Sequence, residues 1–303
     1  MDRVDYLQEY FLDLEEGWGT AYERYALNRF LDKLIKRLDI KSVLELPANG
    51  VMGVPGIKSL IFALHGCEVT LVHPDDAFLK EVKRLWDALE LKAKFVKASY
   101  YKTPLPSSRW DLVWNFCVYE HFKNGREVIK EMSRLSKRYV LVETQNIFNI
   151  GLLFHRIYHL LAREVWDHGE IRRMSYKRVI EDMEMSGLKV IEVGGTDMPP
   201  WPDINMKIMP STPVSRLRTS FERESRERKM QCSQDPAPGS ELRPRVEVLP
   251  TSYIIERWTE KPKRLKTSFP MTLLKMWYII EDYLPTMLKI YLSHHPYVLG
   301  EKV

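Results

Sequence analysis

Short apolar runs alternate with longer amphipathic stretches through most of the chain after residue 42. The short runs have the length of buried β-strands, whereas apolar residues recur at helical spacing in the longer stretches. This alternation predicts an α/β fold with a doubly wound, mostly parallel seven-stranded sheet and helices on both faces. The strands are expected at 42–46, 68–74, 93–99, 111–116, 139–144, 188–195 and 252–258.

The two ends of the chain have helical patterns without strand signals. We therefore divide the chain into an N-terminal helical lid (1–40), an α/β domain (41–258) and a C-terminal helical extension (259–303). Residues from about 196 to 250 are rich in proline and charge and are expected to form an insertion. The apolar run near the C-terminus is interrupted by charged residues, so it predicts packing helices and no membrane-spanning segment.

The loop after the first strand, "VLELPANGVMGVPG" at 43–56, contains several glycines but no GxGxxG fingerprint. Gly50 and Gly53 permit a close approach of the backbone to a ligand, and Asn49 tolerates a left-handed conformation. Pro47 cannot adopt a positive φ, so the turn must be built differently from a dinucleotide loop. A cofactor without phosphates fits this loop better than a dinucleotide does.

The segment "RWDLVWNFCVYEHFKNGREVIKEMSRLSKRYVLVETQNIFN" at 109–149 resembles the class I S-adenosylmethionine-dependent methyltransferases. The resemblance covers roughly residues 15–200 and the run at 252–258. It implies a Rossmann-like sheet and S-adenosylmethionine as the cofactor. It also implies that Glu45 ends the first strand and orders the loop, in which Asn49, Gly50 and Gly53 border the methionine part of the cofactor.

The same resemblance places the adenosine part of the cofactor against later strands. His73 stands where the family has an acid for the ribose hydroxyls, so either this histidine or one of Asp75 and Asp76 would bind them. The resemblance implies that Ser99 borders the adenine and that Asn115 and Phe116 lie under the cofactor.

An aromatic segment, "GWGTAYERYALNRF" at 17–30, precedes the first strand. Tyr25 in this segment has two interpretations: amphipathic packing, or part of a lid over the cofactor, because related methyltransferases place aromatic residues there. A lid tyrosine would contribute to cofactor affinity.

Methyl transfer requires a base only when the nucleophile starts protonated. The candidate bases are His121, after the fourth strand, and His155, after the fifth. His155 and His159 are four residues apart on one helical face and could bind a metal with His168, but core, surface or pocket roles are favoured over metal binding.

Composition narrows the setting of the protein. Three scattered cysteines are too few for a disulfide framework, which favours a reducing, cytoplasmic location, and the N-terminal sequence does not read as a signal peptide. Scarce glutamine beside abundant lysine, arginine and glutamate is typical of thermophile proteins.

The net charge is +5, and the cations gather in residues 257–275. This run is a solvated linker or a patch for an anionic partner.

We therefore predict an S-adenosylmethionine-dependent methyltransferase that acts on a small-molecule or lipid-like acceptor. The alternatives are an inactive methyltransferase-like binding or scaffold protein and an RNA or protein methyltransferase. The segment after the fourth strand reads "NFCV" and lacks the NPPY or DPPY tetrapeptide that is typical of methyltransferases acting on the amino groups of bases. Exocyclic amines of nucleic acids are therefore disfavoured as acceptors. The C-terminal helices could form a homodimer interface or a membrane-surface element, and their mixed charges favour packing.

Overall fold

The structure is a computed structural model that describes residues 18–48, 56–162, 166, 168–198, 255 and 269–303. Most of the expected insertion and the predicted strand at 252–258, apart from Ile255, therefore lie outside the described residues. So do Asn49, Gly50 and Gly53 of the loop after the first strand.

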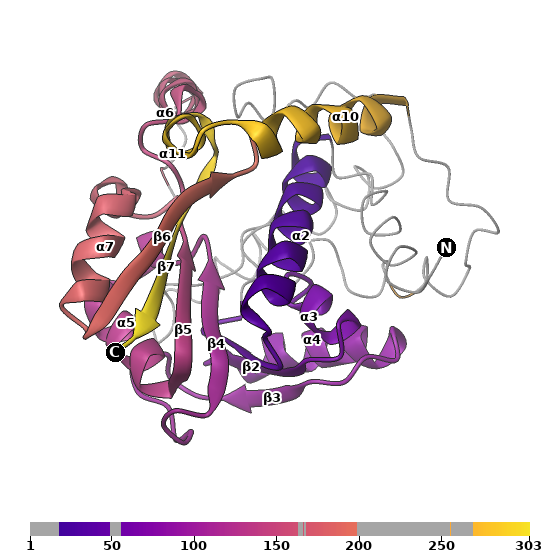
Figure 1. The fold of residues 1–303 in the computed structure, drawn as a ribbon, viewed down its shortest axis with the longest axis vertical. Coiled ribbons are helices and arrows are strands. Elements are labelled where there is room, and N and C mark those ends of the chain that lie inside the picture. The colour runs from indigo at the N-terminus through magenta and orange to yellow at the C-terminus, as the bar shows by residue number, and fades with distance from the viewer. Residues whose placement is uncertain (1–17, 49–55, 163–165, 167, 199–254, 256–268) are drawn as a thin grey trace.

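A seven-stranded sheet with the order β3-β2-β1-β4-β5-β7-β6 forms the centre of the fold (Figure 1). Its strands are β1 (Ser42–Glu45), β2 (Glu68–His73), β3 (Lys94–Lys97), β4 (Trp110–Phe116), β5 (Ser136–Glu143), β6 (Leu188–Thr196) and β7 (His295–Lys302). The strands β1 to β5 pair in parallel, and β7 runs antiparallel to both of its neighbours. The predicted α/β class and the first six strands are confirmed.

The seventh strand of the sheet is not the predicted run at 252–258 but β7, in the segment assigned to a helical extension. Val298 and Leu299 of β7 are buried at the centre of the strand, between β5 and β6. A strand that closes the gap between two others satisfies the backbone groups of both, which a C-terminal helix cannot do. The C-terminal extension is thus helical only as far as residue 292.

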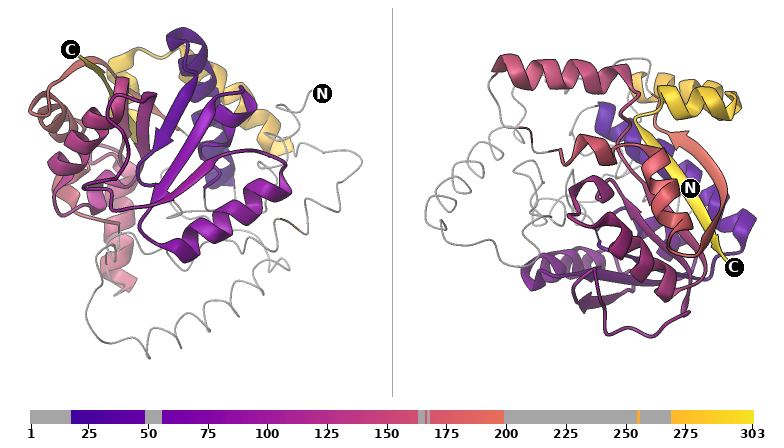
Figure 2. Two further views of the ribbon diagram at one scale, coloured as in Figure 1. Left: turned by 90° about the horizontal axis from the view of Figure 1, so that it is seen from below. Right: turned by 90° about the vertical axis from the view of Figure 1, so that its left-hand side faces the viewer.

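Helices cover both faces of the sheet. One face carries α2 (Trp18–Leu38), α3 (Leu60–Leu64) and α4 (Asp76–Ala88), and the other carries α5 (Gly125–Leu135) and α7 (Tyr176–Glu184). Capping residues fix where two of them begin: Asp75 accepts hydrogen bonds from the first backbone N–H groups of α4, and Asn124 does the same for α5. Three further helices, α6 (Ile150–Ala162), α10 (Phe269–Tyr283) and α11 (Thr286–Leu292), lie together at one end of the molecule (Figures 1 and 2).

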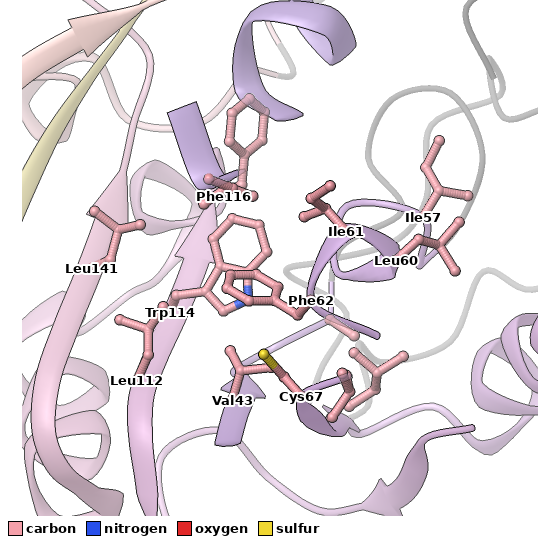
Figure 3. Close-up of a cluster of buried hydrophobic side chains, with 14 of the residues drawn as sticks. Val43, Ile57, Leu60, Ile61, Phe62, Cys67, Leu112, Trp114, Phe116 and Leu141 are labelled. Atoms are coloured by element: carbon pink, nitrogen blue, oxygen red, sulfur yellow. The ribbon is translucent and has the colours of Figure 1, made fainter. Parts of the chain in front are cut away.

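Trp114 of β4 lies at the centre of the core between the sheet and α3 (Figure 3). Its ring packs edge-on against Phe62, with 5.4 Å between the ring centroids, and its Nε1–H donates to Ser59 Oγ at 3.2 Å. A buried tryptophan with a satisfied N–H contributes both apolar area and direction to the packing. It therefore fixes the start of α3 against the sheet.

The N-terminal helix α2 lies between the sheet and α10. Leu27 and Leu31 belong to the same buried cluster as the sheet residues, whereas Tyr22 and Ala26 pack against Leu274 of α10. The segment predicted as a lid therefore contributes a long core helix, and its role as a lid stays a prediction.

Candidate functional site

Strand order reverses between β1 and β4. The strands β2 and β3 extend the sheet on one side of β1, whereas β4 and β5 extend it on the other side. In open α/β sheets, ligands bind beyond the carboxyl ends of the strands at such a reversal. Glu45 and His73 are the last residues of β1 and β2, and Phe116 is the last of β4. The sheet thus brings three of the predicted cofactor residues to one edge.

Glu45 is fully buried and accepts a hydrogen bond from Ser59 Oγ at 2.5 Å. This contact joins the end of β1 to the start of α3 across the loop at 49–55. The loop begins at a cis peptide bond between Leu46 and Pro47. It ends at Gly56, which has φ +69° and where a Cβ would lie 2.3 Å from Val82.

His73 is buried against the ring of Phe78, and its Nδ1 accepts the backbone N–H of Asp75 at 3.0 Å. Burial lowers the pKa of His73 to about 4, although the Asp75 backbone opposes this shift. The imidazole is therefore neutral at pH 7 with its proton on Nε2, so it can donate to a ligand oxygen. Of the predicted alternatives, Asp75 caps α4 and Asp76 pairs with Lys80.

The remaining predicted cofactor residues differ in how they are placed. Ser99 is exposed just after β3, where its Oγ accepts the backbone N–H of Tyr101. Asn115 is fully buried, and its amide donates to Leu46 O at 3.1 Å, so it holds the turn after β1 against β4. The ring of Phe116 lies 3.5 Å from the ammonium group of Lys58.

A second group of polar side chains is buried near the ends of β4, β5 and β7. Lys58 Nζ donates to Glu23 Oε1 at 2.6 Å, and the other oxygen of Glu23 lies 3.6 Å from His295 Nε2. Asp197 Oδ2 is 3.5 Å from the same nitrogen. Glu143 completes the group, which we call the buried charge cluster: Glu23, Lys58, Glu143, Asp197 and His295, all predominantly buried.

Burial and ion pairing shift the pKa values of this cluster in opposite directions. Burial alone would raise the pKa of Glu23, but Lys58 and His295 outweigh it and hold that pKa far below its usual value. Burial lowers the pKa of His295, but Glu23 and Asp197 raise it to above its ordinary value. Burial raises the pKa of Glu143 to about 7, against His295 and Thr196. Glu143 therefore exchanges a proton near neutral pH.

Glu143 also has an unused hydrogen-bonding position. Its Oε2 accepts from Thr196 Oγ1 at 3.0 Å, whereas its Oε1 has no hydrogen-bond partner in the part of the chain that the structure describes. A buried carboxyl with a pKa near 7 and a free oxygen has the properties of a general base.

Three members of the buried charge cluster, Glu23, Asp197 and His295, offer ligand atoms within 4.8 Å of one another. These donors could hold a metal ion. Lys58 already neutralises Glu23, however, and His295 bridges the two carboxylates, so ion pairing accounts for the arrangement without a metal.

Residues 52–140 match a family model described as a methyltransferase domain. This stretch of the chain is therefore a methyltransferase domain. The resemblance predicted from the sequence is thereby confirmed, as is the enzyme class with its acceptor unspecified. S-adenosylmethionine is the cofactor of this family.

Two solved structures are similar to this methyltransferase. One is a SAM-dependent methyltransferase from Aquifex aeolicus, with 15% identity over 65% of this chain and 94% of that chain and a TM-score of 0.45. The other is magnesium protoporphyrin IX methyltransferase from Synechocystis PCC 6803 with bound SAH, with 14% identity over 66% and 95% of the chains and a TM-score of 0.46. No curated protein matches the sequence.

The predicted catalytic histidines lie in different parts of the methyltransferase. His121 ends a short 3-10 helix (Tyr119–His121) after β4, next to the buried Glu120. His155 lies on α6, and its side chain is not described. His159 Nε2 lies 3.2 Å from His168 Nε2.

Tyr25 of α2 contacts α10. Its ring packs edge-on against Tyr278 of α10 with 5.5 Å between centroids, and Lys275 lies over it. This placement corresponds to the packing interpretation.

Sequence patterns did not single out the buried charge cluster. Glu143 lies near the end of the predicted fifth strand, and Lys58 lies in the helical run after the loop, yet neither was chosen as a site residue. A charged residue directly after the apolar run Tyr139–Val142 was the available signal, because such a group is buried only with partners.

Proposed function

We propose that this protein transfers the methyl group of S-adenosylmethionine to a small-molecule or lipid-like acceptor. The observation that carries the proposal is the strand reversal between β1 and β4, with Glu45 and His73 at its carboxyl edge, in a chain that matches a methyltransferase domain. When bound, the cofactor supplies an electrophilic methyl group on a sulfonium.

The residues at this edge fit a cofactor without phosphates. Lys58, the cation just before α3, pairs with Glu23, and the hydroxyl group of Ser59 donates to Glu45. A phosphate would require such donors to be available. Neutral His73 instead offers an uncharged N–H, which suits a ribose hydroxyl oxygen.

We propose Glu143 as the base that accepts a proton from the acceptor during transfer, with His121 and His155 as alternatives. Its support is a pKa near 7 and the free Oε1 described above. Glu143 would accept the proton that the acceptor atom loses as it gains the methyl group, while the bound cofactor would supply that methyl group and keep the electron pair of the broken carbon–sulfur bond.

Isothermal titration with S-adenosylmethionine and S-adenosylhomocysteine tests the cofactor. We expect His73→Ala to weaken S-adenosylhomocysteine binding by about fivefold, because one buried hydrogen bond is worth about 1 kcal/mol. Binding to the wild-type protein should be insensitive to the charge of His73 between pH 6 and 8.

His65→Ala is the matched control, since His65 ends α3 before the start of β2 and pairs with Asp32. It should leave binding unchanged. Wild-type protein that binds neither compound would refute the cofactor and favour the scaffold interpretation. Equal affinity of the His73→Ala variant and the wild type would remove His73 from the site.

A further inference from the structure

Exposed large apolar side chains gather on the three helices at one end of the molecule. Fifteen of them have relative exposures between 42% and 84%: Ile150, Leu153, Phe154, Ile157, Leu160 and Leu161 on α6, Leu273, Met276, Ile279, Ile280 and Tyr283 on α10, and Met287, Leu288, Tyr291 and Leu292 on α11. We call these residues the apolar surface.

The three helices lie at the same end of the molecule. In Figure 1 and in the right-hand view of Figure 2, α6, α10 and α11 lie along the upper edge. Asn149 Nδ2, just before α6, donates to Leu292 O at 2.7 Å, and the ring of Phe148 packs edge-on against Tyr291. The start of α6 therefore adjoins α11.

Helix α10 is apolar on two opposite sides. Leu274 and Tyr278 on its inner side are buried against α2, whereas Met276, Ile279 and Tyr283 recur at helical spacing on the outer side. An apolar side of a helix is normally buried. The exposed apolar side of α10 therefore indicates a contact with a protein or a membrane.

The size of the apolar surface supports the same conclusion. A large side chain at half exposure presents on the order of 100 Å², so fifteen such residues present on the order of 1,000 Å². The largest apolar patch on a typical soluble monomer covers about 300–600 Å², and larger ones mark protein or membrane contacts.

Cations lie on the same three helices as the apolar surface, and the carboxylate of Asp282 is paired with a lysine. Arg156 is exposed on α6, and Lys275 and Lys289 are half-buried on α10 and α11. Asp282, at the end of α10, pairs with Lys33. Residues 257–266 lie outside the described residues; in the sequence they carry five cations (Arg257, Lys261, Lys263, Arg264 and Lys266) and the single acid Glu260.

We propose that the apolar surface docks onto an anionic lipid bilayer, with α6, α10 and α11 lying in the interface between headgroups and acyl chains. Apolar helices bordered by lysine and arginine bind in this way, through buried apolar area and attraction to anionic headgroups. No helix among the described residues is long and apolar enough to cross a membrane. A two-fold contact with a second copy would instead bring the cations of both copies together.

The same helices adjoin the proposed site of methyl transfer. Glu281, on the buried side of α10, accepts the backbone N–H of Asp197 at 3.0 Å, and Ser293 after α11 leads directly into His295. About one helix diameter, 10–12 Å, thus separates the bilayer from the buried charge cluster. A lipid acceptor would reach the site from the membrane; this consequence rests on the proposed function, whereas docking does not.

Flotation of the full chain with vesicles tests the docking. We expect the wild type to float with vesicles of phosphatidylcholine mixed with an equal amount of phosphatidylglycerol, and less with phosphatidylcholine alone. Leu160→Glu and Ile279→Glu should each lower the partition coefficient by about tenfold or more, because each withdraws an inserted side chain. High salt should weaken binding to the mixed vesicles.

Met185→Glu is the matched control, since Met185 is 64% exposed at the end of α7, away from the three helices. It should float as the wild type does. The double variant Leu160→Glu/Ile279→Glu should keep its melting temperature and its affinity for S-adenosylhomocysteine, which separates a failure of docking from a failure of the proposed function.

Two results would overturn the proposal. In the first, folded wild-type protein stays unbound with both vesicle compositions. In the second, sedimentation equilibrium finds a stable dimer that Leu160→Glu dissociates while vesicles are not bound, which would assign the apolar surface to a second copy of the chain.

Discussion

Replacing Lys58 by methionine is expected to lower the free energy of unfolding by about 3–5 kcal/mol. Methionine keeps much of the side-chain volume but removes the cation that pairs with Glu23 at 2.6 Å. Both side chains are almost completely buried, so the carboxylate of Glu23 would lose its main counter-charge in a region of low polarity. Urea denaturation at pH 7 measures the change.

A second substitution and a surface control make this result specific. Glu23→Gln in the Lys58→Met background removes the unpaired charge and should restore most of the lost stability. Lys83→Met breaks the exposed pair with Asp87 and should cost at most about 0.5 kcal/mol. A loss below about 1 kcal/mol for Lys58→Met would show that the pair is not buried as described.

Glu143→Gln is expected to stabilise the protein at alkaline pH and to have little effect in acid. The pKa of Glu143 is about 7 in the folded protein and 4.5 is its ordinary value. Between these values the folded state binds more protons than the unfolded state, so stability falls as pH rises. The full cost, reached above pH 7, is about 3 kcal/mol.

Glutamine keeps the acceptor for Thr196 Oγ1 but does not ionise, so the variant escapes this cost. Urea denaturation at pH 5 and pH 8 should show the variant gaining about 3 kcal/mol over the wild type between the two values. Glu301→Gln, on the neighbouring strand β7, provides the control because Glu301 is partly exposed and pairs with Arg138. Equal pH dependence of Glu143→Gln and the wild type would contradict a raised pKa and weaken the case for Glu143 as a base.

The sequence by itself determined the α/β class, the first six strands and the resemblance to class I methyltransferases. Those features depend on local periodicity, which the chain expresses strongly: the runs predicted at 68–74 and 139–144 are the strands Glu68–His73 and Ser136–Glu143. The resemblance also placed Glu45 and His73 in the first two strands, which end at these residues in the structure.

Only the tertiary structure decided the position of the last strand and the buried charge cluster. The run at His295–Lys302 contains few apolar residues and a glycine, so its pattern is weaker than that of 252–258, and its strand forms because β5 and β6 leave a gap for it. Glu23, Lys58, Glu143 and His295 come from segments far apart in the sequence. A charged side chain becomes buried only when distant partners compensate its lost hydration, and no local pattern records those partners.

For the apolar surface too, the sequence predicted the helices, and only the tertiary structure decided which of their sides are exposed. The C-terminal sequence predicted helices that pack, since its charges interrupt the apolar run. The fold turns Glu281 inward to Asp197 and joins Asp282 to Lys33, which leaves the outer side of α10 without a charge of its own. Which apolar side of α10 faces the core is set by the neighbouring elements, so only the assembled structure could show the other apolar side facing outward.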